Sequence, residues 1–303
     1  MKRSDLFIMG AVLGIIMMMV VPMNKSLLDV LLIINLFASM TVLLVAMNTR
    51  EPLDFSIFPS LLLITTLYRL ALNVSSTRLI LTQADAGRVI ATFGSFVIGQ
   101  NAVVGFIVFL ILVVIQFIVI TRGAERVAEV AARFTLDAMP GKQIAIDADL
   151  NSGLVTEQEA RQRRKTIERE ADFYGAMDGA SKFVKGDAIA SMLIVGINTV
   201  GGLIIGMAMH GFPLAKAAST YTLLSVGDGL VSQIPALLLS TATALMVTRA
   251  ASENNLGEDI VQQVFASPRT LYIAAGAIGA LGLFTPIGPF NTLPVAALAV
   301  FGG

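Results

Sequence analysis

Apolar runs of membrane-spanning length alternate with short polar stretches along most of the chain. A helix needs about 20 apolar residues to cross a bilayer. Runs of roughly that length, or the beginnings of one, occur on both sides of a charged central segment, at 6–23, 27–47, 55–81, 102–120, 188–209, 214–247, 271–286 and 293–303. We therefore expect an all-α, polytopic membrane helical bundle with about eight spans.

Three of these runs are irregular. The run 55–81 is interrupted by Arg69, Asn73 and Arg78, which makes it a weaker span. The run 214–247 contains Gly-Asp-Gly at 227–229 and a proline, so we expect a lead-in helix followed by a span in its second half. The run 293–303 ends too early to cross a bilayer. We expect the chain to stop within its eighth span, with a C-terminal portion missing.

The central segment 121–187 has a different composition. It holds 11 of the 21 basic and 12 of the 21 acidic residues. We expect a small cytoplasmic insert there, so that 1–120 contains spans one to four and 188–303 contains spans five to eight. Thr156 and Glu159 have the spacing of a capping box, which predicts a helix from there to about Lys185. Asp147, Asp149 and Asn151 are expected in a polar loop before it.

Basic residues flanking membrane spans predict which side each flank faces, because cytoplasmic flanks are rich in Lys and Arg. An N-terminus in the cytoplasm places most flanking basic residues and the whole central insert on that side. The opposite side then receives few of them. In this topology the cytoplasmic flanks contain Lys2, Arg3, Arg50, Arg249 and Arg269, and the other side contains Lys25, Arg88 and Lys216.

Composition narrows the function further. Of the 303 residues, 55% are hydrophobic and only 14% are charged, against about 25% in soluble domains, and the net charge is zero. This excludes a disordered chain, a nucleic-acid-binding tail and an ordinary cytosolic enzyme. With no cysteine and one histidine, no thiolate nucleophile, His-rich metal site or Ser-His-Asp triad is expected. Lys142 lacks the flanking residues of a nucleotide-binding loop, so we predict no cofactor and no enzymatic activity.

Charged residues at membrane depth are the candidates for chemistry. Each costs about 2.5–3.5 kcal/mol near the bilayer centre, so such residues mark ion pathways unless they snorkel or pair. Asp187 and Asp228 are the candidate ion-relay carboxylates, and Arg69 and Arg78 are the basic candidates. The alternatives are a boundary ion pair of Asp187 with Lys182 or Lys185, a structural helix break at Asp228, and an Arg78 side chain that reaches the interface.

A basic run in the insert is the candidate docking surface. It could bind an acidic partner or lipid head groups, or it could be a solvated helix face. The run consists of Arg161, Arg163, Arg164 and Lys165.

Four longer motifs resemble one known family. They are Arg69-Leu-Ala-Leu-Asn-Val-Ser-Ser-Thr-Arg78, Met139-Pro-Gly-Lys-Gln143 with the following 147–153, Phe173 to Asp187, and Ser225-Val-Gly-Asp-Gly-Leu-Val-Ser-Gln-Ile-Pro235. Together they resemble the export-gate family of bacterial type III secretion, FHIPEP, and most closely its flagellar members. The family's C-terminal cytoplasmic domain has no counterpart in this sequence.

The resemblance implies a homo-nonameric ring in the bacterial inner membrane, within the basal body. It implies coupling of proton or sodium motive force to the export of unfolded protein. The implied partners are the other export-gate membrane subunits, the export ATPase complex, and substrate–chaperone complexes that dock on the missing domain. By position, the family's functional charges fall on Arg78, Lys182, Asp187 and Asp228.

Three other functions stay open on the residues. A virulence type III injectisome uses a homologous export gate. An autonomous ion-coupled transporter would use the same charges, although the internal repeats expected of one are not evident. A passive scaffold would only recruit partners through the insert 121–187, and neutralising its buried carboxylates would then leave function intact.

Overall fold

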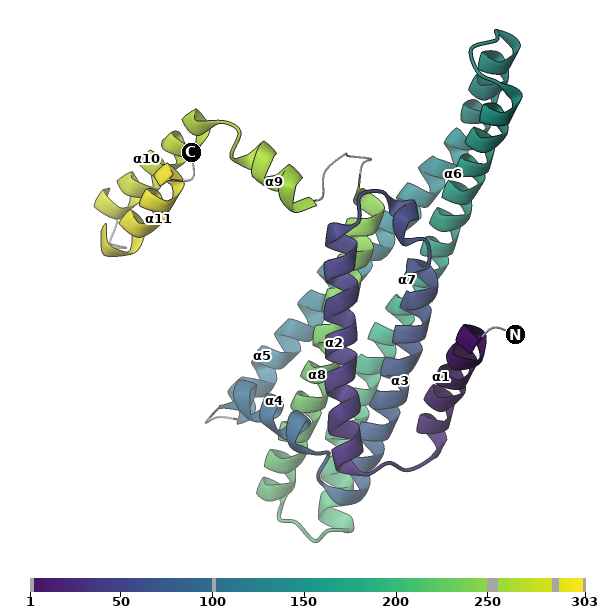
Figure 1. The fold of residues 1–303 in the computed structure, drawn as a ribbon. Coiled ribbons are helices and arrows are strands. Elements are labelled where there is room, and N and C mark those ends of the chain that lie inside the picture. Colours follow the sequence, from purple (N-terminus) through teal and green to yellow (C-terminus); the bar gives the residue numbers. More distant parts are fainter. Residues whose placement is uncertain (1–2, 100–101, 250–255, 285–288, 302–303) are drawn as a thin grey trace. The chain divides into compact units, whose positions relative to one another are not determined.

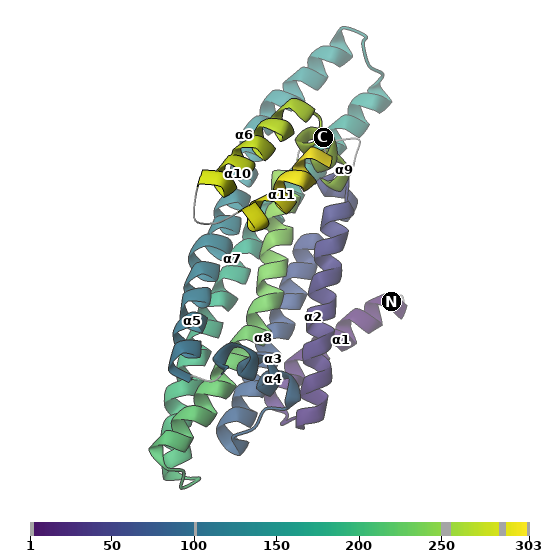
Figure 2. The same ribbon diagram turned by 90° about the vertical axis from the view of Figure 1, so that its left-hand side faces the viewer.

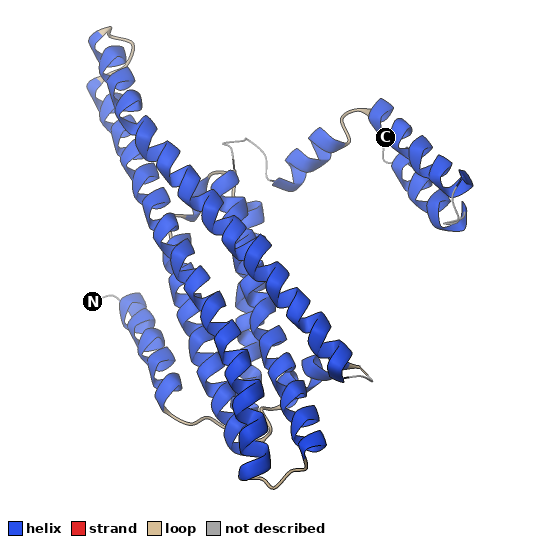
Figure 3. Ribbon diagram, turned by 180° about the vertical axis from the view of Figure 1, so that it is seen from behind, coloured by secondary structure: helices blue, strands red, loops and turns tan. Residues whose placement is uncertain are grey.

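The computed structural model describes residues 3–99, 102–249, 256–284 and 289–301, and within these ranges the chain forms helices without any strand (Figure 3). Five helices in the described ranges are long and apolar enough to cross a membrane. The expected all-α membrane helical bundle is confirmed. The count of eight spans stays a prediction, since the helices at either end of the chain are shorter. The chain divides into two units, 1–46 with 52–249 and 47–51 with 250–303.

The first unit is a bundle of long helices (Figures 1 and 2). Its members α2 (Lys25–Asn48), α3 (Phe58–Gln83) and α8 (Leu214–Thr248) contribute to two buried apolar clusters, and α7 (Glu157–Ala208) contributes to the first of them. Leu62, Met177 and Met246 are fully buried in one cluster, and Leu72 and Tyr221 in the other. The short helix η1 (Pro52–Phe55) precedes α3. The helix α1 (Arg3–Val20) packs along α3. In Figure 1 α8 lies among the other helices of this bundle, and most of its residues between Leu224 and Val247 are buried.

The expected break in the run 214–247 is wrong. α8 is one helix of 35 residues, with Pro235 in its interior. A proline removes one backbone hydrogen bond and usually kinks a helix, but packing on every side can hold the helix together. Gly227 and Gly229 do not break the helix. They allow neighbouring groups to pack closely against it. The backbone of α4 lies against Gly227 and the Phe109 ring lies against Gly229.

A short helix that the pattern did not predict, α4 (Arg88–Ile98), crosses α8. Its N-terminus is capped from another helix: the Asp29 carboxylate accepts hydrogen bonds from the backbone N–H groups of Arg88 and Val89, both at 3.0 Å. A carboxylate is favourable there because the first N–H groups of a helix lack partners and carry partial positive charge. Asp29, although it sits in an apolar run, therefore has a structural role at this helix end.

The fourth span continues directly into the charged insert. α5 (Ala102–Ile115) passes through a π-helical turn, η2 (Gln116–Thr121), into α6 (Arg122–Asn151). On the other side α7 runs without interruption from the insert into span five. The boundary expected at 121 lies where η2 meets α6, and the boundary expected at 187 lies inside α7. The division into three domains stays a prediction. Single π turns often occur at functional sites.

The insert is a helical hairpin formed by α6 and the first half of α7. The capping box is confirmed: the Thr156 hydroxyl accepts from the Glu159 N–H at 3.2 Å, and the Glu159 carboxylate accepts from the Thr156 N–H at 2.7 Å. The expected polar loop at Asp147–Asn151 is wrong, because these residues form the last turns of α6. Their helix is held by ion pairs to α7, including Lys142 Nζ to Glu170 Oε2 at 2.8 Å.

Small residues bring α7 and α8 close together. The Tyr221 ring of α8 covers Gly202 and Gly206, and a Cβ at either glycine would lie less than 3.0 Å from the ring. This pair has the spacing that favours close helix packing in membranes. The glycines thus act through contact with an aromatic ring.

The second unit contains α9 (Leu256–Val264), α10 (Pro268–Phe284) and α11 (Pro289–Phe301). α10 and α11 pack against each other, with Ala275 and Ala296 among their buried residues. They correspond to the runs expected as spans seven and eight. Both are shorter than the five long apolar helices of the first unit.

Candidate functional site

Three helices direct polar side chains to one region of the bundle. Residues four or seven positions apart on a helix lie on the same face, and polar residues repeat at such spacings in α3, α7 and α8 within otherwise apolar segments. We call these eight residues the polar cluster. It comprises Arg69, Asn73 and Ser76 of α3, Asp187, Ser191 and Asn198 of α7, and Asp228 and Ser232 of α8.

A buried ion pair lies at one end of the polar cluster. Arg69 Nη2 is 2.9 Å from Asp187 Oδ2, and the two side chains are 1% and 0% exposed. Their attraction compensates two charges that would each be costly in a membrane interior. The pairing of α3 with α7 by opposite charges explains how an arginine can lie this deep in the run 55–81.

Several polar atoms of this ion pair have no hydrogen-bond partner among the described residues. They are Nε and Nη1 of Arg69 and both carboxylate oxygens of Asp187, whose contact with Arg69 is ionic only. Buried polar atoms of this kind are usually satisfied by protein or water. The ion pair is therefore open to a further polar ligand.

Asp228 lies at the other end of the polar cluster and differs from Asp187. Its Oδ2 accepts a hydrogen bond from Asn198 Nδ2 at 3.1 Å, and the Ser76 hydroxyl also contacts the carboxylate. The residue is only 3% exposed. None of the ion pairs among the described residues includes Asp228, so only neutral groups are known to stabilise its charge. A buried carboxylate without a counter-charge favours the binding of a cation.

Asn73 and Ser232 occupy the space between these two carboxylates. The Ser232 hydroxyl donates to Asn73 Oδ1 at 2.5 Å, and Asn73 Nδ2 donates to the Ser191 hydroxyl at 3.0 Å. The Ser76 hydroxyl donates to the Asn73 backbone carbonyl at 3.0 Å, and Arg69 Nη2 donates to the Ser232 carbonyl at 3.2 Å. Asn73 therefore forms hydrogen bonds with residues of α3, α7 and α8, the three helices of the polar cluster.

The proline in α8 lies close to two carbonyls that accept side-chain hydrogen bonds. A proline ring displaces the preceding turn of a helix and disturbs its carbonyls. In the turn before Pro235, the Ser232 carbonyl accepts from Arg69, and the Gln233 carbonyl accepts from Gln116 Nε2 at 3.0 Å. Gln116 belongs to the π turn η2. The irregular turns of two helices thus meet beside the polar cluster.

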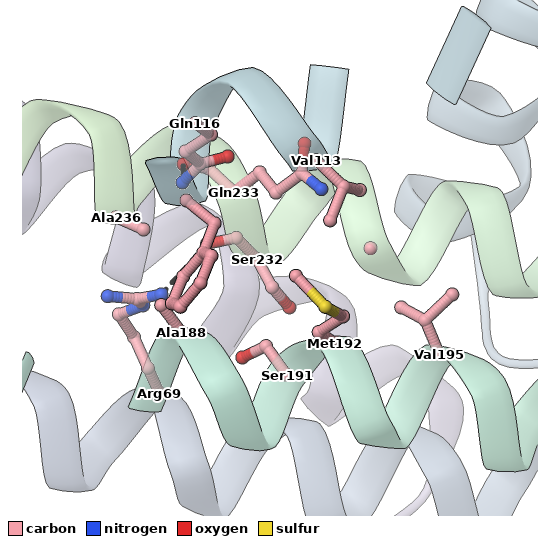
Figure 4. A pocket seen from close by; sticks show the side chains of 12 residues that line it. Arg69, Val113, Gln116, Ala188, Ser191, Met192, Val195, Ser232, Gln233 and Ala236 are labelled. Carbon is pink, nitrogen blue, oxygen red and sulfur yellow. Dashed lines mark hydrogen bonds between the residues drawn. The ribbon is translucent and has the colours of Figure 1, made fainter. Parts of the chain in front are cut away.

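A small cavity of about 30 Å³ opens next to the polar cluster. In Figure 4 the Ser191 and Ser232 side chains lie between α7 and α8, with Arg69 to one side and Gln116 beyond Gln233. A cavity needs about 10–15 Å³ of this kind of volume to hold one water molecule. It therefore has room for one or two waters next to a charged pair.

Two of the predicted basic residues lie elsewhere. Arg78 donates to the backbone carbonyls of Val20 and Met19 at the C-terminal end of α1, both at 3.0 Å. Lys182 is mostly exposed and pairs with Asp178 at 2.7 Å. That hydrogen bond to the Asp178 carboxylate raises the pKa of the Lys182 ammonium group.

Among the described residues, neither Arg78 nor Lys182 forms an ion pair with Asp187 or Asp228. The alternative of a boundary pair of Asp187 with Lys182 or Lys185 is wrong, because Asp187 pairs with Arg69 and Lys185 binds Glu125 at 3.0 Å. Asp187 prefers Arg69, which lies on the helix packed directly against its own. A functional role of Arg78 and Lys182 stays a prediction.

The basic run of the insert is partly neutralised. Arg163 Nη1 pairs with Asp149 Oδ2 at 3.1 Å, and Arg164 pairs with Asp147. Both acidic partners belong to α6, so these pairs join the two helices of the hairpin. Arg161 and Lys165 are exposed. Docking of a partner on this run stays a prediction.

Four residues of the polar cluster were not singled out from the sequence: Ser76, Ser191, Asn198 and Ser232. A signal for two of them was present. Ser191 follows Asp187 by four positions, and Ser232 follows Asp228 by four. Polar residues at that spacing within apolar runs indicate one shared helix face.

Comparisons with known proteins agree with the motifs. The chain is 61% identical over 302 residues to flagellar biosynthesis protein FlhA of Bacillus subtilis, covering 100% of this chain and 45% of that protein. It is 55% identical to FlhA of Salmonella typhimurium, covering 90% of this chain and 40% of the relative. The low calcium response locus protein D of Yersinia pestis is 48% identical, with 100% and 43% covered.

The chain thus spans less than half the length of these curated relatives. No solved structure matches it. The family comparison matches residues 15–303 to the FHIPEP family, nearly the whole chain. This match and the similarity to the FlhA relatives show the family, and the long apolar helices agree with it. The chain belongs to the FHIPEP family.

Proposed function

We propose that the chain is the membrane region of a flagellar type III export-gate subunit. It couples proton or sodium motive force to the movement of unfolded export substrates across the inner membrane. The FHIPEP family match and the flagellar relatives support an export component. The ion coupling rests on the geometry of the polar cluster.

The observation that supports coupling most directly is the difference between the two buried carboxylates. Asp187 is compensated by Arg69 at 2.9 Å, whereas Asp228 has only neutral partners among the described residues. Charged groups at membrane depth are costly, and they mark ion pathways when they are kept there. Two carboxylates on neighbouring helices, with a polar connection between them, suit stepwise cation transfer.

The chemistry follows from these partners. A proton or sodium ion that reaches Asp228 neutralises a buried charge. A cation that reaches Asp187 competes with Arg69, which then loses its ionic partner. An interaction lost in one state and kept in the other shifts a conformational equilibrium by the difference in free energy. Breaking the ion pair would therefore change the packing of α3 against α7.

The remaining parts of the proposal concern placement and assembly. The subunit lies in the bacterial inner membrane within the basal body, crosses it several times and has its N-terminus in the cytoplasm. It forms a homo-nonameric ring of its own copies and works with the other export-gate membrane subunits and the export ATPase complex. Substrate–chaperone complexes bind to a C-terminal domain beyond this sequence. Arg161 and Lys165 are available for lipid or partner contacts.

A virulence injectisome is the second candidate setting. The observation that favours it is the identity of 48% to the Yersinia protein over the full length of this chain. The higher identity of 61% to a flagellar relative favours the flagellar setting. Complementation separates the two: the full-length protein is expected to restore flagellar secretion in a strain lacking its flagellar relative.

Secretion by full-length protein with Asp228→Asn or Asp187→Asn tests the coupling. Asparagine keeps the size and polarity of aspartate but cannot bind a proton as a carboxylate does. We expect export of flagellar substrates into the medium to stop in each variant while the membrane level of the protein is unchanged. Asn35→Ala, which removes a buried polar side chain of α2 outside the polar cluster, is the control and is expected to export normally at an unchanged membrane level.

The passive scaffold predicts a different result. If both variants export at the normal rate, the buried carboxylates are structural and the proposed coupling is rejected. An autonomous transporter predicts ion exchange by the purified protein without any export partner.

A further inference from the structure

We propose that Asn73 and Ser232 are positioning residues that join the Arg69–Asp187 ion pair to Asp228, so that the two carboxylates act as one coupled unit. This inference rests on the proposed ion coupling and deepens it. Two independent pathways, one for each carboxylate, are the alternative. The choice between them depends on what lies between the carboxylates.

The first step is the continuity of the contacts. From Asp187 the contacts pass to Arg69 at 2.9 Å and from Arg69 to the Ser232 carbonyl at 3.2 Å. The Ser232 hydroxyl contacts the Asn73 side-chain oxygen at 2.5 Å, and the Asn73 backbone carbonyl accepts from the Ser76 hydroxyl at 3.0 Å. Ser76 contacts Asp228.

The second step is the chemistry of Asn73. Its amide group has two donor hydrogens and one acceptor oxygen, so it can hold hydroxyl groups on two other helices at once. Here it accepts from Ser232 of α8 and donates to Ser191 of α7. Asn73 is buried at 3% exposure, so loss of one partner leaves a polar atom without compensation. A movement of α7 or α8 at this point is therefore transmitted to the other helix.

The third step is the shared contact of Arg69 and Asn73 with one residue. Arg69 binds the backbone carbonyl of Ser232, and Asn73 binds its hydroxyl. When a cation binds Asp187 and Arg69 loses its ionic partner, Ser232 is the residue that Arg69 still contacts. The cavity of about 30 Å³ borders Arg69, Ser191 and Ser232, and it has room for a water that could bridge them.

An exchange of the two side chains tests the coupling. In the full-length protein, Asn73→Ser removes the amide, Ser232→Asn introduces a second amide, and the double variant restores an amide–hydroxyl pair of the same total composition. We expect each single variant to reduce the rate of flagellar substrate export about tenfold, the effect of losing one buried hydrogen bond. We expect the double variant to recover most of that loss.

A second readout separates coupling from simple structural damage. The dependence of export rate on external pH is measured for each variant at equal membrane level. Each single variant is expected to shift the midpoint of that dependence, and the double variant to return it. Ser232→Thr keeps the hydroxyl at a position that borders the cavity, and it is expected to export nearly normally. This variant provides the comparison if the exchange variants fail to accumulate. Ser39→Ala, which removes a buried hydroxyl that donates to the Asn35 carbonyl within α2, is the matched control.

The outcomes distinguish this inference from the function on which it rests. If Asp187→Asn and Asp228→Asn stop export but the exchange variants leave the rate and its pH dependence unchanged, the coupling is wrong and the proposed function stands. If both aspartate variants export normally, the proposed function fails first. A double variant no better than either single variant at equal membrane level also overturns the coupling.

Discussion

Replacing Arg69 with leucine is expected to destabilise the protein by about 3–5 kcal/mol, because Asp187 would remain buried without a counter-charge. The ion pair is almost completely inaccessible, with side chains 1% and 0% exposed. Arg69 also contributes a hydrogen bond to the Ser232 carbonyl. The measurement is thermal unfolding of the full-length protein in detergent.

The double variant Arg69→Leu, Asp187→Leu is the control for this prediction. Replacing both partners of a buried ion pair by apolar residues is often neutral or even stabilising. We therefore expect the double variant to unfold at a higher temperature than Arg69→Leu alone, although it cannot couple ions. A double variant less stable than the single variant would show that the uncompensated charge is not the cause.

The second large effect is expected at the crossing of α4 and α8. A Cβ at Gly227 would lie less than 3.0 Å from the Ile90 carbonyl, and a Cβ at Gly94 would meet the Leu223 carbonyl. Both obstacles are backbone atoms, so the clash requires the two helices to move apart. Overpacking of this kind costs about 1–3 kcal/mol, and Gly227→Ala is expected to reach at least the upper end of that range. Thermal unfolding of the purified protein measures it.

Gly196→Ala is the matched control for the helix crossing. Gly196 lies within α7, and a Cβ there has no neighbouring atom within 4 Å. Alanine is the better helix former, so this variant is expected to be as stable as the original protein or slightly more stable. Equal stability of Gly196→Ala and Gly227→Ala would contradict the described helix crossing.

The all-α membrane architecture was predictable because it depends on local sequence. Runs of about 20 apolar residues and a capping box are properties of adjacent positions. Five of the expected runs lie in helices long and apolar enough to cross a membrane, and the capping box is present. The continuity of α8 was not predictable in this way. Glycines at 227 and 229 are normally read as helix breakers, and only their contacts with α4 and Phe109 show that they permit close packing. Those contacts depend on the arrangement of three helices.

The candidate site divides in the same way. Arg69, Asp187 and Asp228 were predicted because a charge within an apolar run is unusual wherever it occurs. The alternative of an ion pair between Asp187 and a nearby lysine was wrong. It relied on closeness in sequence, whereas the observed partner, Arg69, is 118 positions away. Helix packing brings α3 beside α7, and a pairing between distant segments leaves no mark in a single sequence. Asn198 and Ser76 escaped notice because isolated polar residues in a span are common.

Ion movement itself tests the central claim most directly. Inverted membrane vesicles containing the full-length protein with its export partners are loaded with a pH indicator or a sodium indicator, and ion flux is followed under an imposed gradient. The account predicts that flux of one of the two ions depends on the protein and is lost in Asp228→Asn at an unchanged membrane level. If vesicles with Asp228→Asn showed the same proton flux and the same sodium flux as vesicles with the original protein, the account would be contradicted.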